Sequence, residues 1–285
     1  MTSILSWNIQ CGLGCDGIQD LGRIADQIRE TGDPDVICLQ EISRFMPELD
    51  QNKGEDQVKV LGDLFPDYMP MFGAAINWQG TSPAKRQQFG NLVLSRLPVL
   101  QAFFHPLPQP HDVGIKHMPR QLCEVIVECV SGPLRILTTH LEYHSEGQRM
   151  AQVNAIHDLH QRVCDNIRFP GQNPQSGPYH QVARPETSVI CGDFNFTPDT
   201  PEYMQILSEF KHATSALTDA WCAHKPGIAH DPTCGIFDKK QWSEGPHARD
   251  FFFITQDLTP KVKDTIVNTK TNASDHQPLL LTLDY

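Results

Sequence analysis

Carboxylate, amide and imidazole side chains recur along this 285-residue chain at the ends of apolar segments that have the composition of β-strands. Some of them end or follow such a segment, and the others stand at or just before the start of one. In chain order they are Asn8, Glu41, His140, Asp193, Asn195, Asp250, Asp275 and His276. If the last two strands run antiparallel to the earlier ones, all of these side chains reach the same edge of the sheet system. Ligand sites in α/β sheets commonly lie there, so the sequence predicts one shared pocket.

Such a pocket has the chemistry of a site for a hard cation. Carboxylate and amide oxygens without a thiolate favour Mg²⁺ or Mn²⁺ over Zn²⁺. An aspartate next to a histidine supplies general-base chemistry and a contact to phosphate. A metal ion with imidazole and amide donors suits a phosphoester, whose transition state spreads negative charge over its equatorial oxygens. Each residue taken alone is more often a turn former or an ordinary polar residue, so it is the order and grouping that favour function.

The elements that must position these residues alternate between strand-like and helix-like patterns. Alternating or short apolar runs predict strands at 4–9, 36–40, 68–72, 89–95, 99–105, 121–130, 134–140, 187–192, 251–255 and 279–283. Apolar residues at helical spacing predict helices at 21–31, 146–167 and 201–210, the last of them opened by Pro201 in its first turn. Mixed strands with interspersed helices predict a layered α/β sandwich.

One domain over residues 1–285 is the simplest organisation for this pattern. The length alone allows two domains, and two polar stretches rich in proline and glycine, 106–119 and 169–185, could be linkers. We interpret both as loops, because the strands on either side belong to one sheet system and long loops often form functional rims.

The composition excludes some classes of protein. With 23 Lys and Arg against 34 Asp and Glu, the net charge of −11 argues against a protein that coats nucleic acid by charge alone. The longest apolar runs, such as 36–39, have four residues, which is too short to span a membrane, and we see no signal peptide. The nine cysteines are odd in number and form no CxxC pair, so we expect free thiols in a reducing cytoplasm.

Six short segments resemble the motifs of the endonuclease/exonuclease/phosphatase superfamily, which is deoxyribonuclease I-like, and the resemblance extends over residues 3–283. The segments are 6–9 (Ser-Trp-Asn-Ile), 39–42 (Leu-Gln-Glu-Ile), 139–142 (Thr-His-Leu-Glu), 192–195 (Gly-Asp-Phe-Asn), 249–251 (Arg-Asp-Phe) and 274–278 (Ser-Asp-His-Gln-Pro). The resemblance implies a four-layer α/β sandwich of two packed mixed sheets flanked by helices. It also implies a metal-dependent phosphoric ester hydrolase of a bacterial type. Where members usually carry Arg-Ile-Asp-Tyr, this chain has Ala248-Arg249-Asp250-Phe251, a departure at the residue before the aspartate.

The same resemblance implies a role for each matching residue. The metal ligands are Glu41, Asn8 and Asp275. Asp193 orients or deprotonates the attacking water, while Asn195 and His140 hold the phosphate. His276 contacts the phosphate or transfers a proton, and Asp250 holds its imidazole, because an aspartate fixes the tautomer of the ring and favours the imidazolium.

Substrate-binding residues are harder to assign. Asn91 and Arg120 lie in segments that resemble the family, and His144 and Arg149 follow the His140 motif. Arg149 is alternatively a solvated helix residue. Some aromatic and histidine side chains of presumed loops can line the rim or anchor those loops to the core; they are Trp78, Trp221, Phe237, Trp242 and His247. Three histidines in the proline-rich stretch, His105, His111 and His117, are interpreted as surface residues.

The sequence therefore predicts a cytoplasmic, monomeric phosphoesterase that uses Mg²⁺ or Mn²⁺ and does not insert into membranes. The substrate is expected to be a phosphodiester or phosphomonoester that is small or carries the reacting group at an end, including nucleotides and nucleic-acid ends. Two alternatives stay open: a DNA endonuclease or exonuclease that acts on repair intermediates, and an inactive member that serves as an interaction module. Lys85-Arg86 and Lys239-Lys240 are the only paired basic residues, too few for a duplex-binding stripe.

Overall fold

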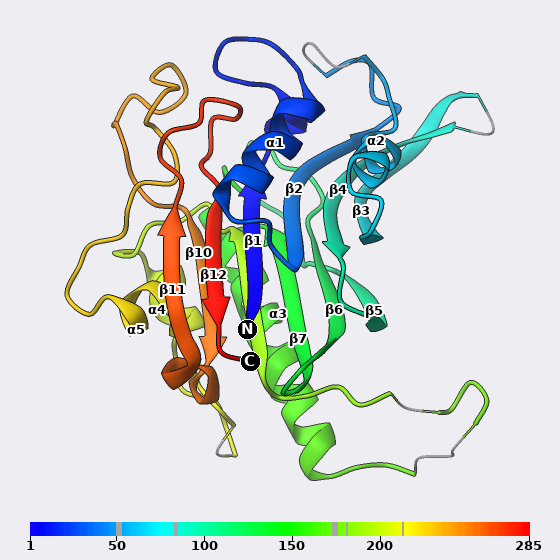
Figure 1. Ribbon diagram of the computed structural model, residues 1–285, viewed down its shortest axis with the longest axis vertical. Helices are drawn as coiled ribbons and strands as arrows, with labels where there is room; N and C mark the ends of the chain where they lie inside the picture. Colours follow the sequence, from blue (N-terminus) through cyan, green and yellow to red (C-terminus); the bar gives the residue numbers. More distant parts are fainter. Residues whose placement is uncertain (50–52, 83–84, 173–175, 181, 213) are drawn as a thin grey trace.

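The computed structural model describes the chain apart from residues 50–52, 83–84, 173–175, 181 and 213. Two six-stranded mixed sheets pack against each other, and helices flank them (Figure 1). The fold is thus the predicted four-layer α/β sandwich.

The first sheet has the strand order β11-β12-β1-β2-β4-β3. Its strands are β1 (Thr2–Asn8), β2 (Val36–Arg44), β3 (Met69–Ser82), β4 (Lys85–Ser95), β11 (Val262–Val267) and β12 (Leu279–Leu283). The second sheet has the order β5-β6-β7-β8-β10-β9. Its strands are β5 (Val99–Pro106), β6 (Gln121–Cys129), β7 (Gly132–His140), β8 (Ser188–Asp193), β9 (Leu217–Asp219) and β10 (Asp250–Thr255).

The described helices are α1 (Leu21–Thr31), α2 (Gln57–Leu64), α3 (Glu146–Arg168), α4 (Pro201–Ile206) and α5 (Ala220–His224), with 3₁₀ turns η1 (Gln10–Gly12) and η2 (Gln256–Lys261). Alternating side chains of the strands sort into the layers. Ile4 belongs to the cluster between the sheets, whereas its neighbour Leu5 packs in the cluster beneath α1 and α2. Ile156 of α3 and Phe251 of β10 lie in the cluster on the outer face of the second sheet. Each sheet is therefore apolar on both faces.

Strand direction brings the ends of these strands together, as the sequence argument required. β12 runs antiparallel to β1, and β10 runs antiparallel to β8. β1 and β2 are parallel, and so are β7 and β8. The carboxyl ends of β1, β2, β7 and β8 and the amino ends of β10 and β12 consequently meet at one side of the sandwich.

Several predicted elements need correction. The helix opened by Pro201 ends at Ile206, not near Phe210, because Ser208 donates its hydroxyl to the Gln205 carbonyl and the Phe210 ring stacks on His157. Residues 57–64 form a helix that was not predicted; Asp56 caps that helix by accepting from the Lys59 amide. The short elements β9, α5 and β11 were not predicted.

The two proline- and glycine-rich stretches join elements of the sandwich. Residues 107–120 connect β5 to β6, and the segment after α3 leads to β8, with residues 173–175 and 181 of it outside the described part of the chain. All nine cysteines are free thiols. Among the described residues, the helices include none with the length and apolarity needed to cross a bilayer.

Candidate active site

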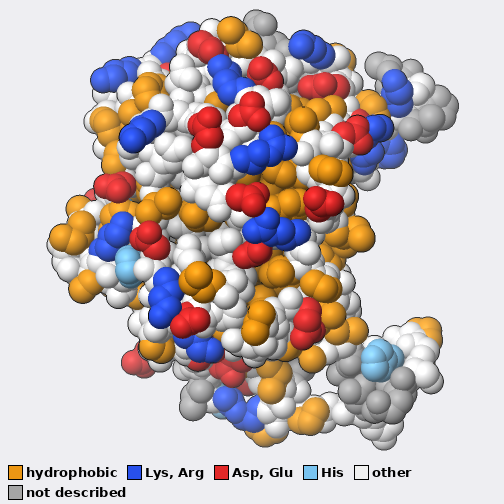
Figure 2. Space-filling view, in the orientation of Figure 1, with side chains coloured by type: hydrophobic (Ala, Val, Ile, Leu, Met, Phe, Trp, Pro, Cys, Tyr) orange, Lys and Arg blue, Asp and Glu red, His pale blue; other side chains and the backbone are white. Residues whose placement is uncertain are grey.

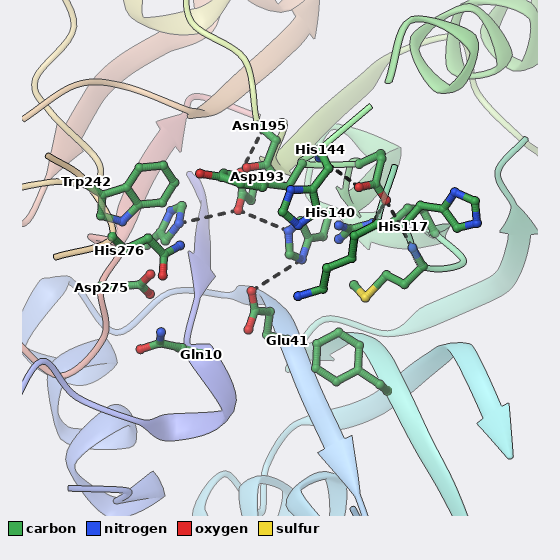
Figure 3. Close-up of a pocket in the computed structure, with 17 residues that line it drawn as sticks. Gln10, Glu41, His117, His140, His144, Asp193, Asn195, Trp242, Asp275 and His276 are labelled. Carbon is green, nitrogen blue, oxygen red and sulfur yellow. Dashed lines mark hydrogen bonds and ion pairs between the residues drawn. The ribbon is translucent and has the colours of Figure 1, made fainter. Parts of the chain in front are cut away.

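A cavity of about 430 Å³ opens where the strand ends of both sheets meet (Figure 3). Its described lining combines acidic, amide, imidazole and aromatic groups: Gln10, Glu41, Phe89, Lys116, His117, Met118, Arg120, His140, Glu142, Tyr143, His144, Asp193, Asn195, Gln241, Trp242, Asp275 and His276. Asp193 of β8 pairs in register with His140 of β7 on one side and with Asp250 of β10 on the other. The second sheet therefore delivers three polar groups side by side.

Asn8 links the two sheets at this cavity. Its Nδ2 donates to Asp193 Oδ2 at 3.0 Å and to Glu41 Oε1 at 3.1 Å. Its Oδ1 accepts from the backbone amide of Gln10 at 3.1 Å. Asn8 thus orients two carboxylates with its nitrogen, while its oxygen is already engaged by the backbone.

Glu41 reaches the cavity because β2 is irregular at that point. The pairing of β2 with β4 shifts between Leu39 and Ile42, and Glu41 itself has φ 59°. A bulge of this kind turns a side chain away from the face that the strand alternation assigns to it. The carboxylate consequently lies in the cavity next to His140 (Figure 3).

The turn after β8 is fixed by its backbone. Gly192 has φ 138°, and a Cβ at that position would lie 1.9 Å from the Thr139 carbonyl, so only glycine allows β7 to approach. Asn195 has φ 54°. Its backbone N–H donates to Asp193 Oδ1 at 3.0 Å, and its side-chain Nδ2 donates to the Leu141 carbonyl at 3.0 Å. Asp193 and Asn195 are therefore held rigidly at the cavity floor.

A buried chain of charged groups joins Asp193 and Asp250 of the second sheet to His276, which precedes β12 of the first sheet. His276 Nδ1 lies 2.8 Å from Asp250 Oδ2, and His276 Nε2 lies 3.6 Å from Asp193 Oδ2. Burial alone would lower the pKa of His276, but Asp250 and Asp193 outweigh burial and raise it well above its usual value. The ring is therefore held as imidazolium, with Nδ1 on Asp250 and Nε2 towards Asp193.

The two histidines beside Asp193 have opposite protonation behaviour. His140 Nε2 lies 3.4 Å from Asp193 Oδ2, on the other side of the carboxylate from His276 (Figure 3). Burial, assisted by the charge of Arg120, lowers the pKa of His140 to about 3, so His140 is neutral near pH 7. Burial would raise the pKa of Asp193, but the His276 charge keeps it below its usual value. The centre therefore combines a carboxylate, an imidazolium and a neutral imidazole.

Glu41, Asp275 and Gln10 line one side of the cavity and offer oxygen donors for a cation (Figure 3). Burial, and then the charge of Asp275, raise the pKa of Glu41 to about 7, and burial also raises the pKa of Asp275. A divalent cation would offset the charge of these two carboxylates, of which Asp275 is buried and Glu41 is half-buried. The donor set has no thiolate and fits Mg²⁺ or Mn²⁺.

Of the four predicted substrate residues, two line the cavity and two do not. Arg120 and His144 line the cavity. Asn91 does not, because its Nδ2 donates to the Gln121 carbonyl at 2.9 Å. Arg149 is neither solvated nor in the cavity: its Nε binds Glu202 at 3.0 Å, and the side chain is buried.

The predicted rim and surface residues also differ in whether they line the cavity. Trp242 lines the cavity and packs edge-on against His276, with ring centroids 5.7 Å apart. Trp221 instead lies in α5 and donates to the Ile228 carbonyl at 3.1 Å, a bond that holds the following segment against this helix. His117 lines the cavity although it was interpreted as a plain surface residue, and His105 is half-buried against Glu124 at 2.9 Å, which corrects the surface interpretation for that residue.

Sequence reasoning missed several lining residues. Gln10 stands two positions after Asn8, and Glu142 ends the segment 139–142 that contains His140. Both positions adjoin residues that had been identified, so the signal available was their proximity to a motif. Phe89 stands two positions before Asn91 and offered the same signal, whereas the loop residue Lys116 had none.

The chain is similar to known proteins in both sequence and fold. A profile described as "Endonuclease/Exonuclease/phosphatase family" matches residues 5–276. Among solved structures, an endonuclease/exonuclease/phosphatase from Beutenbergia cavernae is 25% identical with a TM-score of 0.70, covering 98% of this chain and 70% of that chain. A humanized D. rerio TDP2 is 18% identical (TM-score 0.63; 100% and 99% covered), and a Bacteroides thetaiotaomicron mannosyl-6-phosphatase is 16% identical (TM-score 0.63; 100% of both). These last two show the fold alone. No curated protein matches.

Proposed function

The chain belongs to the endonuclease/exonuclease/phosphatase family, and from this premise we propose that it is a Mg²⁺- or Mn²⁺-dependent phosphoesterase. One observation carries the proposal. Asn8 of the first sheet bridges Glu41 and Asp193, and Asp193 in turn lies between two imidazoles. One cavity therefore contains two carboxylates for a cation, Glu41 and Asp275, beside the carboxylate of Asp193 with its imidazole neighbours for proton transfer. Metal-assisted hydrolysis of a phosphoester requires both groups.

Each residue of the site has its own role in the proposed reaction. A divalent ion held by Glu41 and Asp275 would neutralise charge on the phosphoryl oxygens. Asp193 accepts a hydrogen bond from the attacking water and orients it or takes its proton. The His276 imidazolium donates from Nε2 to the phosphoryl group, and Asp250 keeps the ring in that orientation. Asn195 retains an N–H beyond its bond to Leu141 for an equatorial oxygen.

We further propose a small substrate, or one that presents its phosphoester at an end. A cavity of about 430 Å³ is within the usual range for small ligands. Lys116 and Arg120 line it and suit a phosphate group. The net charge of −11 disfavours a broad duplex nuclease. The free cysteines support a reducing, cytoplasmic location.

A DNA nuclease is the second candidate, and one surface feature favours it. The β3–β4 hairpin projects from the sandwich, and basic side chains gather near that projection (Figures 1 and 2). Trp78 on β3 is 52% exposed, and Lys85 and Arg86 begin β4. Exposed aromatic and cationic groups can stack on bases and bind phosphates of a single strand.

Turnover of chromogenic substrates tests the proposal. We expect the protein to hydrolyse bis-p-nitrophenyl phosphate or p-nitrophenyl phosphate with Mg²⁺ or Mn²⁺, and Asp193→Asn to lower the rate by about 10²- to 10⁴-fold. Asp219→Asn is the matched control, because Asp219 is equally buried and lies outside the cavity. Turnover of neither ester with either metal would favour an interaction module. Faster nicking of plasmid DNA than hydrolysis of the esters would favour the nuclease.

A further inference from the structure

Glu142 is a fully buried carboxylate that gathers donors from two loops of the cavity. Its Oε2 accepts from Arg120 Nε at 3.2 Å and from the Met118 amide at 3.4 Å. Its Oε1 accepts from the His144 amide at 2.9 Å. Burial would raise the pKa of Glu142, but the His144 amide and Arg120 lower it below its usual value. Glu142 is therefore a buried anion that fastens the loop before β6 to the loop after β7.

Arg120 is the charged partner of Glu142, which binds only the Nε of its guanidinium. The side chain is 6% exposed and lines the cavity. Its Nε binds Glu142, whereas its Nη1 is buried and finds no hydrogen-bond partner among the described residues. An unpaired buried N–H is costly unless an incoming group accepts it. The guanidinium also acts on His140, whose pKa it helps burial to lower, so its charge reaches the reacting centre.

The backbone beneath Arg120 is fixed independently of Glu142. The Arg120 carbonyl accepts from the Leu107 amide at 2.9 Å. The next carbonyl, that of Gln121, accepts from Asn91 Nδ2 at 2.9 Å and from Thr139 Oγ1 at 3.2 Å. The main chain at residues 120 and 121 is thus held without Glu142. Among the described residues, the guanidinium forms its one hydrogen bond through Nε to Glu142, so its direction depends on that contact.

We propose that Glu142 is a positioning residue that aims Arg120 at the phosphoryl group in the cavity; this inference rests on the proposed function. By accepting from Nε, Glu142 holds the back of the guanidinium and leaves an Nη donor for a phosphoryl oxygen. Its charge also balances that of Arg120 when the cavity is empty. Asn91, predicted to bind substrate, instead binds the backbone carbonyl of the next residue, Gln121.

The test is binding of inorganic phosphate, measured by calorimetry and by inhibition of turnover. Glu142→Gln keeps the size of the side chain and can still accept from the His144 amide, but it loses the charged pair with Arg120. We expect phosphate to bind about 10- to 100-fold more weakly and KM to rise, with a smaller change in kcat. Glu142→Asp, which keeps the charge, is expected to restore part of the loss and serves if the glutamine variant does not fold.

Glu124→Gln is the matched control. Glu124, like Glu142, is a fully buried carboxylate that accepts from the Nε of an arginine, here Arg184 at 2.7 Å, and neither of these two residues lines the cavity. A merely structural role for Glu142 would make both variants lose stability and neither lose phosphate affinity. The inference requires that only Glu142→Gln lose phosphate affinity.

A double-mutant cycle decides whether Glu142 acts through Arg120. We expect Arg120→Ala combined with Glu142→Gln to bind phosphate no more weakly than Arg120→Ala alone, because the arginine is then absent. Additive losses, or unchanged binding in Glu142→Gln, would overturn the inference while leaving the proposed function intact. A wild-type protein that binds phosphate but hydrolyses no phosphoester would instead refute the proposed function.

Discussion

Replacing Glu41 with glutamine is expected to stabilise the metal-free protein and to abolish its response to metal. Burial and Asp275 raise the pKa of Glu41 from 4.5 to about 7, so the folded protein holds the carboxyl proton more tightly than the unfolded chain does. For a carboxyl with a raised pKa, stability falls as pH rises from the unfolded to the folded value. The wild type therefore loses stability between about pH 4.5 and pH 7, and the glutamine variant lacks that loss.

The size of the effect follows from the same pKa. A change from 4.5 to about 7 corresponds to a cost of about 3 kcal/mol for the ionised carboxylate at pH 8. The Glu41 side chain is 26% exposed, so solvent screening lowers the expected cost to about 1–3 kcal/mol. Glutamine keeps the acceptor for Asn8 Nδ2 and removes the charge. A ligand at one hundred times its Kd should stabilise the wild type by about 2.7 kcal/mol, and the variant by far less.

Urea denaturation at several pH values, with EDTA and with Mg²⁺, measures both effects. Without metal at pH 8 the Glu41→Gln variant should be the more stable protein, and the difference should vanish below about pH 4.5. Glu202→Gln should instead lose stability, because Glu202 is ion-paired with Arg149. A Glu41→Gln variant that gains as much from Mg²⁺ as the wild type would refute the metal assignment. A variant less stable than the wild type without metal would refute the electrostatic argument.

Two further outcomes follow from buried carboxylates. In Asp250→Asn the pKa of His276 should fall, since Asp250 raises it, and the alkaline limb of the pH–rate profile should move to lower pH. Burial would raise the pKa of Glu124, but hydrogen bonds from His105 and Arg184 lower it to about 2. That carboxylate therefore contributes about 3 kcal/mol to stability above pH 4.5, and this contribution is lost as the pH falls towards 2. In denaturation experiments, Glu124→Gln should be less stable than the wild type at pH 7 and should approach it in acid.

The sandwich itself was predictable because its strands are buried on both faces or alternate clearly. The run 36–40 and the helix pattern 21–31 have apolar spacings that leave little choice of structure. The elements that were missed are short or weakly patterned. β11, for example, is an edge strand with mostly exposed side chains, so its sequence carries little apolar periodicity.

The identities of the polar residues in the cavity were predictable, but their contacts were not. Glu41 faces the cavity only because β2 bulges, and no residue type in 39–42 marks a bulge at a non-glycine position. Arg149 was predicted to bind substrate or, alternatively, to be a solvated helix residue, yet it turns inwards to Glu202, which is 53 residues away in the chain. The bonds of Asn91 to Gln121 and of Glu142 to Arg120 are contacts of the same long-range kind. Such pairings depend on tertiary packing, which spacing along the chain does not encode.

The site lies across the seam between the two sheets, so its geometry is a property of their packing. Asn8 of the first sheet binds Asp193 of the second, and His276, which precedes β12, binds Asp250 of β10. In the same seam Gln40 donates to Thr138 at 2.8 Å, a buried polar bond between the two sheets. A slip of one sheet against the other would break all three bonds together. A shift of about 1 Å in catalytic groups can cost on the order of 100-fold in rate, so the apolar layer between the sheets aligns the reacting groups as well as stabilising the fold.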